Sequence, residues 1–439
     1  MTTKTYDFIA IGIGPFNLGL ACLVQPIKEI TSLFIDQKAG FNWHPGMMLE
    51  SSTMQTPFMA DLVTLASPTH PLSFLNYIKQ KGRIYSFYIR ESFFLMRKEY
   101  NQYCQWAAEQ LSNLRFNTRV ENISYDSSTS LYTLHCADTL TGQKHQFFCK
   151  KLVLGTGPSS YIPKCCRPFA DHMVTSGDYL ENKAALQQKK SITVLGSGQS
   201  AAEIFYDLLE DIDTYGYQLN WVTRSPRFFP LEYTKLTLEM TSPEYVDYFY
   251  SLPENKREAL NRSQQSLYKG INSSLINEIF DLMYTKRLSG ELDVSLYTNS
   301  ELRQVHFIAE KQGVAEEQKL ILDLFQHEQE AAFSLETEGL VLATGYQYQI
   351  PSFMEGIQHL IRWDKQGRYD VQRNYSIDCR NEIFVQNVEL HTHGFVTPDL
   401  GMASYRNSCL IQEITGTAHY EIEKSIAFQQ FGVASEGVF

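Results

Sequence analysis

The sequence predicts an α/β fold with two dinucleotide-binding, Rossmann-like domains and a small helical substrate-binding region. Two glycine-rich turns, at residues 12–17 and 196–201, each follow a short apolar run and precede a stretch of helical character. A second apolar run then ends in a charged residue, Asp36 after the first turn and Arg224 after the second. This order of strand, turn, helix and strand is typical of dinucleotide-binding units.

The first turn follows the apolar run 8–11 and reads Gly-Ile-Gly-Pro-Phe-Asn, with Asn17 where the usual pattern has a third glycine. Glycines allow a tight turn and let backbone N–H groups approach a pyrophosphate at the start of the following helix. The strand 33–35 ends in Asp36, whose carboxylate suits free ribose hydroxyls. The expected cofactor-binding residues are Gly12, Gly14, Pro15, Phe16, Asn17 and Asp36.

The second turn follows the apolar run 192–195 and has alanine, an accepted variant, at the third-glycine position. The next strand, 221–223, ends in Arg224, which suits a ribose 2′-phosphate. The expected cofactor-binding residues are Gly196, Ser197, Gly198, Gln199, Ser200 and Arg224. Two dinucleotides are therefore predicted, FAD in the first unit and NADPH in the second, and this pairing indicates a redox enzyme.

The order of these signals predicts that the second unit is inserted into the first. Residues 1–190 would form the first part of an FAD-binding domain, and residues 191–337 an NADPH-binding domain with a helical insert at about 240–290. Residues 338–439 would complete the FAD-binding domain, because they open with a buried strand and glycine turn like those at 152–157.

Composition excludes several classes of partner. The chain has 439 residues, a formal net charge of −11 and no long block of lysine or arginine, so nucleic acid is not expected as a partner. The apolar stretch 8–24 follows Asp7 and is interrupted by the glycine turn, so we interpret it as a buried strand and not as a signal peptide or membrane span.

The eight cysteines form no CxxC pair and no spacing typical of a zinc site. We expect reduced thiols and a cytoplasmic location, with no redox-active pairing of the adjacent Cys165 and Cys166. His391 and His393 have no evident third ligand nearby, so no metal site is predicted.

Five segments carry a more specific signal: the Gly-x-Gly-Pro-Phe-Asn-Leu start, the loop 43–47, and residues 54–56, 343–346 and 392–394. Together they resemble the flavin-dependent amine N-hydroxylating monooxygenases of siderophore biosynthesis, the family of lysine and ornithine N-monooxygenases. The resemblance runs nearly end to end. It implies that NADPH reduces FAD, that O2 adds to give a flavin hydroperoxide, and that a neutral primary amine becomes a hydroxylamine.

The resemblance also implies roles for particular residues. Gln55 matches a flavin-contacting glutamine of the family and is the candidate catalytic residue, although a local backbone contact is its alternative role. Trp43, His44, Thr344 and Gly345 are further candidate cofactor-binding residues, and core packing is the alternative for Trp43 and His44. Relatives often assemble as homotetramers, so a homo-oligomer is expected.

Four positions depart from the lysine and ornithine enzymes. Ala60 stands where the family has a lysine that binds the substrate carboxylate, and Leu238, Leu267 and Gly401 stand where it has two asparagines and a serine. A carboxylate desolvated without these partners would be strongly disfavoured. These four are the expected substrate-pocket residues, and they predict an aliphatic diamine, putrescine or cadaverine, as in the diamine branch of the family.

Other interpretations stay open at this point. Lys269 or Arg227 could bind a carboxylate instead, and the substrate would then be L-lysine or L-ornithine. A flavin monooxygenase that acts on sulfur or ketones, and a non-catalytic nucleotide-binding regulator, are the competing classes. A diamine would also need an acceptor for its far ammonium. The candidates are Glu232, Glu239, Glu389 and Asp399.

Overall fold

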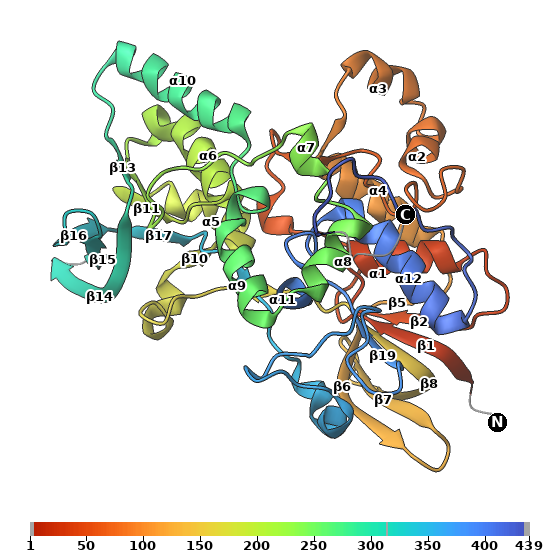
Figure 1. Cartoon of the computed structure of the whole chain (residues 1–439). Coiled ribbons are helices and arrows are strands. Elements are labelled where there is room, and N and C mark those ends of the chain that lie inside the picture. Colours follow the sequence, from red (N-terminus) through yellow and green to blue (C-terminus); the bar gives the residue numbers. More distant parts are fainter. Residues whose placement is uncertain (1–3, 313–314, 434–439) are drawn as a thin grey trace.

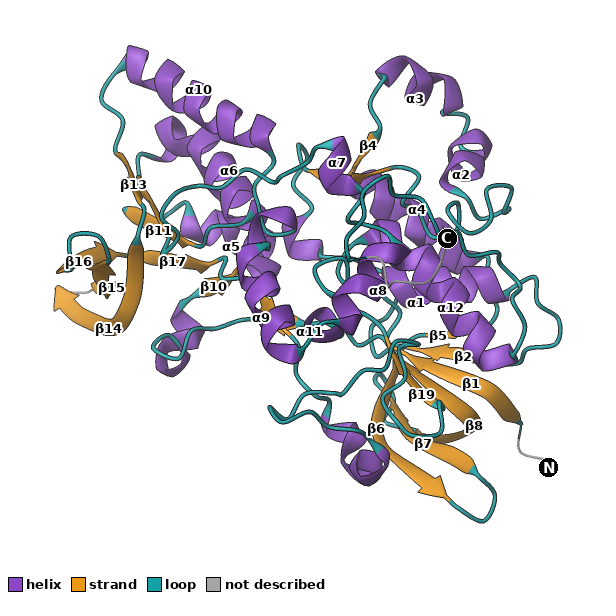
Figure 2. Ribbon diagram, viewed as in Figure 1, coloured by secondary structure: helices purple, strands orange, loops and turns teal. Residues whose placement is uncertain are grey.

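A seven-stranded sheet and a five-stranded sheet lie on opposite sides of the molecule, with short helices between them (Figures 1 and 2). The structure is a computed structural model that describes residues 4–312 and 315–433. The predicted α/β class, with two Rossmann-like units, is confirmed by this arrangement.

The first sheet has the strand order β5–β2–β1–β8–β7–β6, and β19 pairs with the C-terminal end of β8. β1, β2, β5, β8 and β19 run parallel, whereas β6, β7 and the first half of β8 form an antiparallel meander. The strands are β1 (Thr5–Ile11), β2 (Ser32–Ile35), β5 (Leu114–Arg115), β6 (Thr118–Asp126), β7 (Leu131–Asp138), β8 (Lys144–Leu154) and β19 (Ile383–Val385).

Both faces of this sheet are buried, which explains the continuous apolar run in β1. Phe8 and Ala10 belong to one core cluster, and Ile9 and Ile11 belong to another on the opposite face. Helices α1 (Pro15–Val24), α4 (Arg97–Glu109) and α12 (Ala403–Thr415) pack in the first cluster, and the 3-10 segment η5 (Ser352–Leu360) packs in the second.

The second sheet is parallel throughout, in the order β10–β17–β11–β12–β13. Its strands are β10 (Val174–Thr175), β11 (Ser191–Leu195), β12 (Gln218–Val222), β13 (Val294–Tyr297) and β17 (Gly339–Leu342). Helices α5 (Tyr179–Leu186), α6 (Gln199–Tyr215) and α10 (Ser273–Ser289) share a core cluster with it. A separate antiparallel sheet contains β14 (Ser300–Gln312), β15 (Ala315–Gln326) and β16 (Ala331–Thr337).

The second sheet extends past both predicted boundaries, residues 191 and 337. β10 lies before the first boundary, and β17 pairs with β11 through Val341 and Val194 although the sequence predicts its return to the first sheet. A buried apolar strand followed by glycine looks the same in either parallel sheet. The chain returns toward the first unit after β17. There β18 (Tyr346–Gln347) pairs with β9 (Ser159–Ser160), so the segment that leaves the first unit and the segment that re-enters it lie side by side.

The predicted helical insert, at about 240–290, is divided in the structure, because its last helix, α10, packs on the second sheet. The rest of it forms a helical region between the sheets. This region contains α7 (Lys235–Leu238), α8 (Pro243–Ser251), α9 (Glu254–Ser263) and η4 (Gln265–Leu267), with α11 (Leu390–His393) packed against α8 and α9. Ser242 caps α8, because its Oγ accepts a hydrogen bond from the N–H of Tyr245 at 3.2 Å, and Pro243 follows at the first helical position.

The remaining elements are short. They are η1 (Pro45–Met47), β3 (Thr53–Pro57), α2 (Phe74–Gln80), α3 (Ile84–Arg90), β4 (Phe94–Met96), η2 (Arg167–His172), η3 (Ser176–Asp178) and η6 (Leu400–Met402). Within the described residues, no helix combines the length and apolar character that a membrane crossing needs.

Candidate active site

A cavity of about 2140 Å³ is lined by both glycine turns and by the helical region. Pockets for small molecules measure about 300–1,000 Å³, so this cavity has room for two dinucleotides and a small substrate. Every residue predicted from the sequence to bind a cofactor or line the substrate pocket lies on its wall.

The first glycine turn has the geometry of a pyrophosphate cradle. Gly12 has a φ of +89°, and a Cβ there would lie 2.4 Å from the carbonyl oxygen of Gly155. A Cβ on Gly14 would meet nothing within 4 Å, which leaves open space in front of the turn. Helix α1 has no side-chain cap, so its first N–H groups are free to bind an anion.

Asn17 supports this turn from behind. Its Nδ2 donates to the carbonyl oxygens of Gly12, at 2.7 Å, and Ile11, at 3.3 Å, and its Oδ1 accepts from Nε2 of Gln386 at 2.6 Å. The side chain is buried, and its polar atoms are engaged by the protein. The departure from a third glycine therefore serves to position the turn. Gln386 carries no local sequence signal for this contact.

Asp36 is bonded to the same turn. Its Oδ2 accepts from the N–H of Ile13 at 2.7 Å, and its Oδ1 accepts from the N–H of Lys38 at 2.8 Å. Each carboxylate oxygen accepts more than one hydrogen bond, so capacity for ribose hydroxyls is left.

Trp43 and His44 pack against neighbouring aromatic rings and also line the cavity. The Trp43 ring lies 5.4 Å from the ring of Tyr100, and the His44 ring contacts Trp43 at 4.8 Å and Tyr346 at 5.7 Å. Burial, together with the nearby cation of Arg97, lowers the pKa of His44 to about 4. The imidazole is therefore neutral at neutral pH.

The second glycine turn repeats the cradle. A Cβ on Gly196 would lie 2.2 Å from the carbonyl oxygen of Ala343, and α6 begins after Gly198 without a side-chain cap. On the returning segment, Thr344 donates from Oγ1 to the carbonyl of Tyr161 at 2.5 Å, and Gly345 has a φ of +87°.

Two cationic side chains, Arg224 and Lys269, lie close together near the C-terminal end of β12. Arg224 is exposed on the cavity wall and makes no ion pair within the described residues. Lys269 lines the same cavity, and burial together with the nearby Arg224 lowers its pKa. Two cations without an intervening carboxylate suit a phosphate. Arg227, in contrast, lies over the ring of Phe229 at 4.4 Å and does not line the cavity.

Gln55 lies at the junction of the two units. Its Nε2 is 3.4 Å from Oε1 of Gln199 and 3.4 Å from the carbonyl oxygen of Gly270. Gln199 in turn donates to Glu203 at 2.9 Å, and Glu203 pairs with Arg97. The candidate catalytic glutamine is thus connected to the second glycine turn. The sequence gives no sign of Arg97 or Glu203, because they lie 106 residues apart.

The four predicted substrate-pocket residues all line the cavity. Ala60 is buried, Leu238 is partly exposed, and Leu267 and Gly401 complete the set. None of these side chains carries a charge or a hydrogen-bonding group. These four side chains therefore offer nothing to a substrate carboxylate, whereas Lys269, the alternative ligand, lines the same cavity.

Two of the four candidate acceptors for an ammonium lie elsewhere. Glu389 is fully buried and pairs with Arg406 at 3.0 Å, and Glu239 accepts backbone N–H groups from Phe428 and Gln429. Neither carboxylate lines the cavity, whereas Glu232 and Asp399 do.

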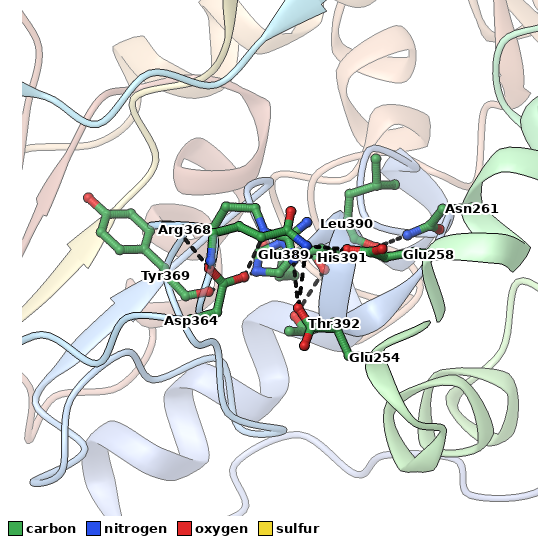
Figure 3. A network of polar contacts seen from close by, with 11 residues as sticks. Glu254, Glu258, Asn261, Asp364, Arg368, Tyr369, Glu389, Leu390, His391 and Thr392 are labelled. Atoms are coloured by element: carbon green, nitrogen blue, oxygen red, sulfur yellow. Dashed lines mark hydrogen bonds and ion pairs between the residues drawn. The ribbon is translucent and has the colours of Figure 1, made fainter. Parts of the chain in front are cut away.

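A polar network connects α9, the turn at residues 364–369 and α11 (Figure 3). Arg368 pairs with Asp364 at 2.6 Å and lies 3.4 Å from Glu254 of α9, and Asn261 of α9 donates to the carbonyl of Leu390 at 3.0 Å. These contacts tie α9 to α11.

The two histidines of α11 contact different partners. His391 bonds through Nε2 to the carbonyl of Tyr369 at 2.8 Å, and His393 stacks on Tyr375 at 4.5 Å. Among the described residues, no three metal-ligating side chains are grouped as a metal site requires.

Comparison with known proteins gives consistent matches over the whole chain. The solved structure of DfoA bound to FAD, the cadaverine monooxygenase of the desferrioxamine pathway from Erwinia amylovora, is 63% identical, with a TM-score of 0.96, and the match covers 99% of this chain and 100% of that one. A putrescine N-hydroxylase from Shewanella oneidensis is 53% identical over 97% of this chain and 84% of its own length. A putrescine N-hydroxylase from Acinetobacter baumannii is 48% identical over 99% and 95%.

The sequence profile of one family matches residues 4–348, which is most of the chain and includes both glycine turns. The competing classes, a sulfur or ketone monooxygenase and a non-catalytic regulator, are not supported by these matches. The chain belongs to the L-lysine 6-monooxygenase/L-ornithine 5-monooxygenase family.

Proposed function

We propose that the protein N-hydroxylates one primary amine of an aliphatic diamine, putrescine or cadaverine, with FAD, NADPH and O2. The hydroxylamine product would supply hydroxamate siderophore biosynthesis. Relatives that match over nearly the whole chain are named for reactions on putrescine and cadaverine, which supports this assignment.

One observation carries the choice of a diamine over an amino acid. Ala60, Leu238, Leu267 and Gly401 line the cavity, and none of their side chains has a cation, amide or hydroxyl group for a substrate carboxylate. Transfer of an unpaired carboxylate from water to such a lining costs several kcal/mol. A diamine has no carboxylate and avoids this cost.

The residues of the two cradles fit the two cofactors. The free N–H groups at the start of α1 would bind the pyrophosphate of FAD, and Asp36 the ribose hydroxyls. The start of α6 would bind the pyrophosphate of NADPH, and Arg224 and Lys269 its 2′-phosphate. When bound, the reduced flavin supplies the means of activating O2.

The protein's own contribution is to hold the amine in its reactive, uncharged form and to exclude water. An aliphatic ammonium has an unperturbed pKa of about 10.4, so a proton must be lost before the nitrogen can react. Removal of the amine from water inside the cavity favours its neutral form. We infer that Gln55, which contacts Gln199 at the second glycine turn, orients the reacting groups.

We further propose a cytoplasmic homo-oligomer. All eight cysteines are free, and several are buried, as expected in a reducing compartment. Helix α10 exposes Phe280, Tyr284 and Leu288 at intervals of four residues, which forms an apolar stripe that a second copy of the chain would cover. Light scattering on the FAD-loaded protein measures the assembly directly.

Product analysis tests the proposed reaction. The FAD-loaded enzyme is supplied with NADPH, ¹⁸O2 and either putrescine or cadaverine, and the products are analysed by mass spectrometry. We expect a hydroxylamine that contains one ¹⁸O atom. NADPH oxidation that releases only hydrogen peroxide with both diamines would contradict the proposal.

A further inference from the structure

A bound diamine presents a charge that the cavity must balance. One nitrogen reacts as the neutral amine, but the other remains an ammonium, because its unperturbed pKa is about 10.4. In lysine or ornithine the α-carboxylate accompanies the far ammonium, and a diamine lacks it. The far end of the cavity therefore needs a carboxylate from the protein.

Four carboxylates line the cavity among the described residues: Asp36, Glu232, Glu301 and Asp399. Asp36 is bonded to the first glycine turn, and Glu301 pairs with Arg303 at 2.8 Å and lies 3.2 Å from His327. Glu232 is exposed and accepts from the hydroxyl of Ser266 at 2.8 Å. Each of these three is engaged elsewhere or faces solvent.

Asp399 is less exposed than Glu232, and among the described residues a single hydrogen bond and no ion pair engages its carboxylate. Its Oδ1 accepts from the N–H of Gly401 at 2.7 Å, and no group of the described residues donates to Oδ2. Burial raises the pKa of this carboxyl, against the opposing effects of the Gly401 N–H and Arg406. An ammonium beside Oδ2 would stabilise the charged form.

Asp399 contacts one of the four predicted substrate-pocket residues directly, because its Oδ1 accepts the N–H of Gly401. Leu400 packs in the core cluster that contains Ala60, and Met402 packs in the cluster that includes Leu267. The nearby Tyr233 lines the same cavity, and burial together with Asp399 raises its pKa.

The lack of a side chain at Gly401 leaves space for the carboxylate of Asp399. A Cβ at position 401 would lie 3.2 Å from Oδ1 of Asp399, closer than an ordinary van der Waals contact. A serine at this position would push against the carboxylate that the glycine N–H holds. Glycine therefore does more than remove a hydroxyl group, because it leaves room for Asp399.

We propose that Asp399 binds the far ammonium of the diamine and that Gly401 holds its carboxylate in place for this contact. Asp399 is then the residue that selects a second cationic end in the substrate. This inference rests on the proposed function and identifies the part of the site that gives it specificity.

The test compares a diamine with a monoamine of the same length. FAD-loaded wild-type enzyme and Asp399→Asn are assayed for hydroxylamine formation with 1,4-diaminobutane and 1-aminobutane, and with the corresponding five-carbon pair. Asparagine keeps the hydrogen bond from the Gly401 N–H and removes only the charge. We expect the diamine KM to rise about 10- to 100-fold with little change in kcat, as a lost charged hydrogen bond predicts.

Three further measurements make the result decisive. The monoamine KM should change less than about threefold in Asp399→Asn, and all substrates less than threefold in the control Glu232→Gln. Gly401→Ala, which keeps the carboxylate but crowds it, should raise the diamine KM selectively. If Asp399→Asn does not fold, the diamine KM of Gly401→Ala tests the role of Asp399 by itself.

The possible failures are distinguishable. A wild-type enzyme that hydroxylates no diamine contradicts the proposed function itself. A wild-type enzyme active on diamines, with variants at 399 and 401 that affect diamine and monoamine equally or not at all, overturns the role of Asp399 alone.

Discussion

Arg97 and Glu203 form a two-point ion pair across the junction of the two units, with N–O distances of 2.8 and 2.9 Å. Arg97 begins α4 in the first unit and also donates to the carbonyl of Met47 at 2.7 Å, and Glu203 lies on α6 of the second. Glu203 also accepts from Gln199, which contacts Gln55. The pair therefore fixes the candidate catalytic glutamine relative to both cradles.

Loss of the Glu203 charge should destabilise the protein markedly. The side chains of Arg97 and Glu203 are only 13% and 4% exposed, so Glu203→Gln leaves a mostly buried guanidinium without its counter-ion. We expect the free energy of unfolding to fall by about 3 kcal/mol. The control Arg362→Gln breaks the exposed pair with Asp370 and should cost at most about 1 kcal/mol. Urea unfolding measures both, and equal effects would contradict the structural role of the pair.

Restoring the usual third glycine should weaken FAD binding. Asn17→Gly removes two hydrogen bonds to the turn and leaves Gln386 without its acceptor. We expect a loss of about 1–3 kcal/mol, or roughly 5- to 150-fold in the Kd for FAD. Titration of the flavin-free protein by fluorescence measures this Kd. Binding that is unchanged or tighter would show that the asparagine does not support the cradle.

A cation at position 60 should impair diamine turnover. Ala60 is 6% exposed on the cavity wall, so Ala60→Lys would place a charge near the substrate ammonium. We expect the diamine KM to rise about tenfold or more, whereas Ala60→Met, of similar length but neutral, should have a smaller effect. Unchanged diamine kinetics in Ala60→Lys would mean that position 60 does not face the substrate.

Because of His44, the free energy of unfolding should decrease as the pH falls into the mildly acidic range. Its pKa is about 4 in the folded protein and about 6.5 when unperturbed, so the unfolded chain binds the extra proton between these values. Stability is therefore fully present above pH 6.5 and falls as the pH decreases toward 4. Unfolding measured at matched FAD occupancy should show a shallower pH dependence for His44→Gln, by at most about 1.4 kcal/mol per pH unit. An identical slope in both proteins would contradict the assignment.

Local patterns locate the two glycine turns and the charged residues at the strand ends. Gly12, Gly14, Asp36 and Arg224 are recognisable because each requirement, a tight turn or a charge at a strand end, is met within a short segment. The position of β17 is not recognisable in this way, because its apolar strand would fit either sheet. The domain boundary at 338 is misplaced for that reason.

Long-range contacts account for the rest. The sequence leaves four carboxylates as equal candidates for the ammonium, and only the fold shows that Glu389 is paired with Arg406 while Asp399 lines the cavity. The contact between Gln55 and Gln199 joins residues 144 positions apart. Such pairings depend on how the two units are placed together, which no local pattern encodes.

Substrate preference tests the central claim most directly. The FAD-loaded enzyme is assayed for hydroxylamine formation with putrescine, cadaverine, L-ornithine and L-lysine under one set of conditions. The absence of a carboxylate-binding side chain at positions 60, 238, 267 and 401 predicts that kcat/KM for the better diamine exceeds that for either amino acid by about 100-fold or more. A kcat/KM for L-lysine or L-ornithine equal to or above that of the diamines would contradict the account.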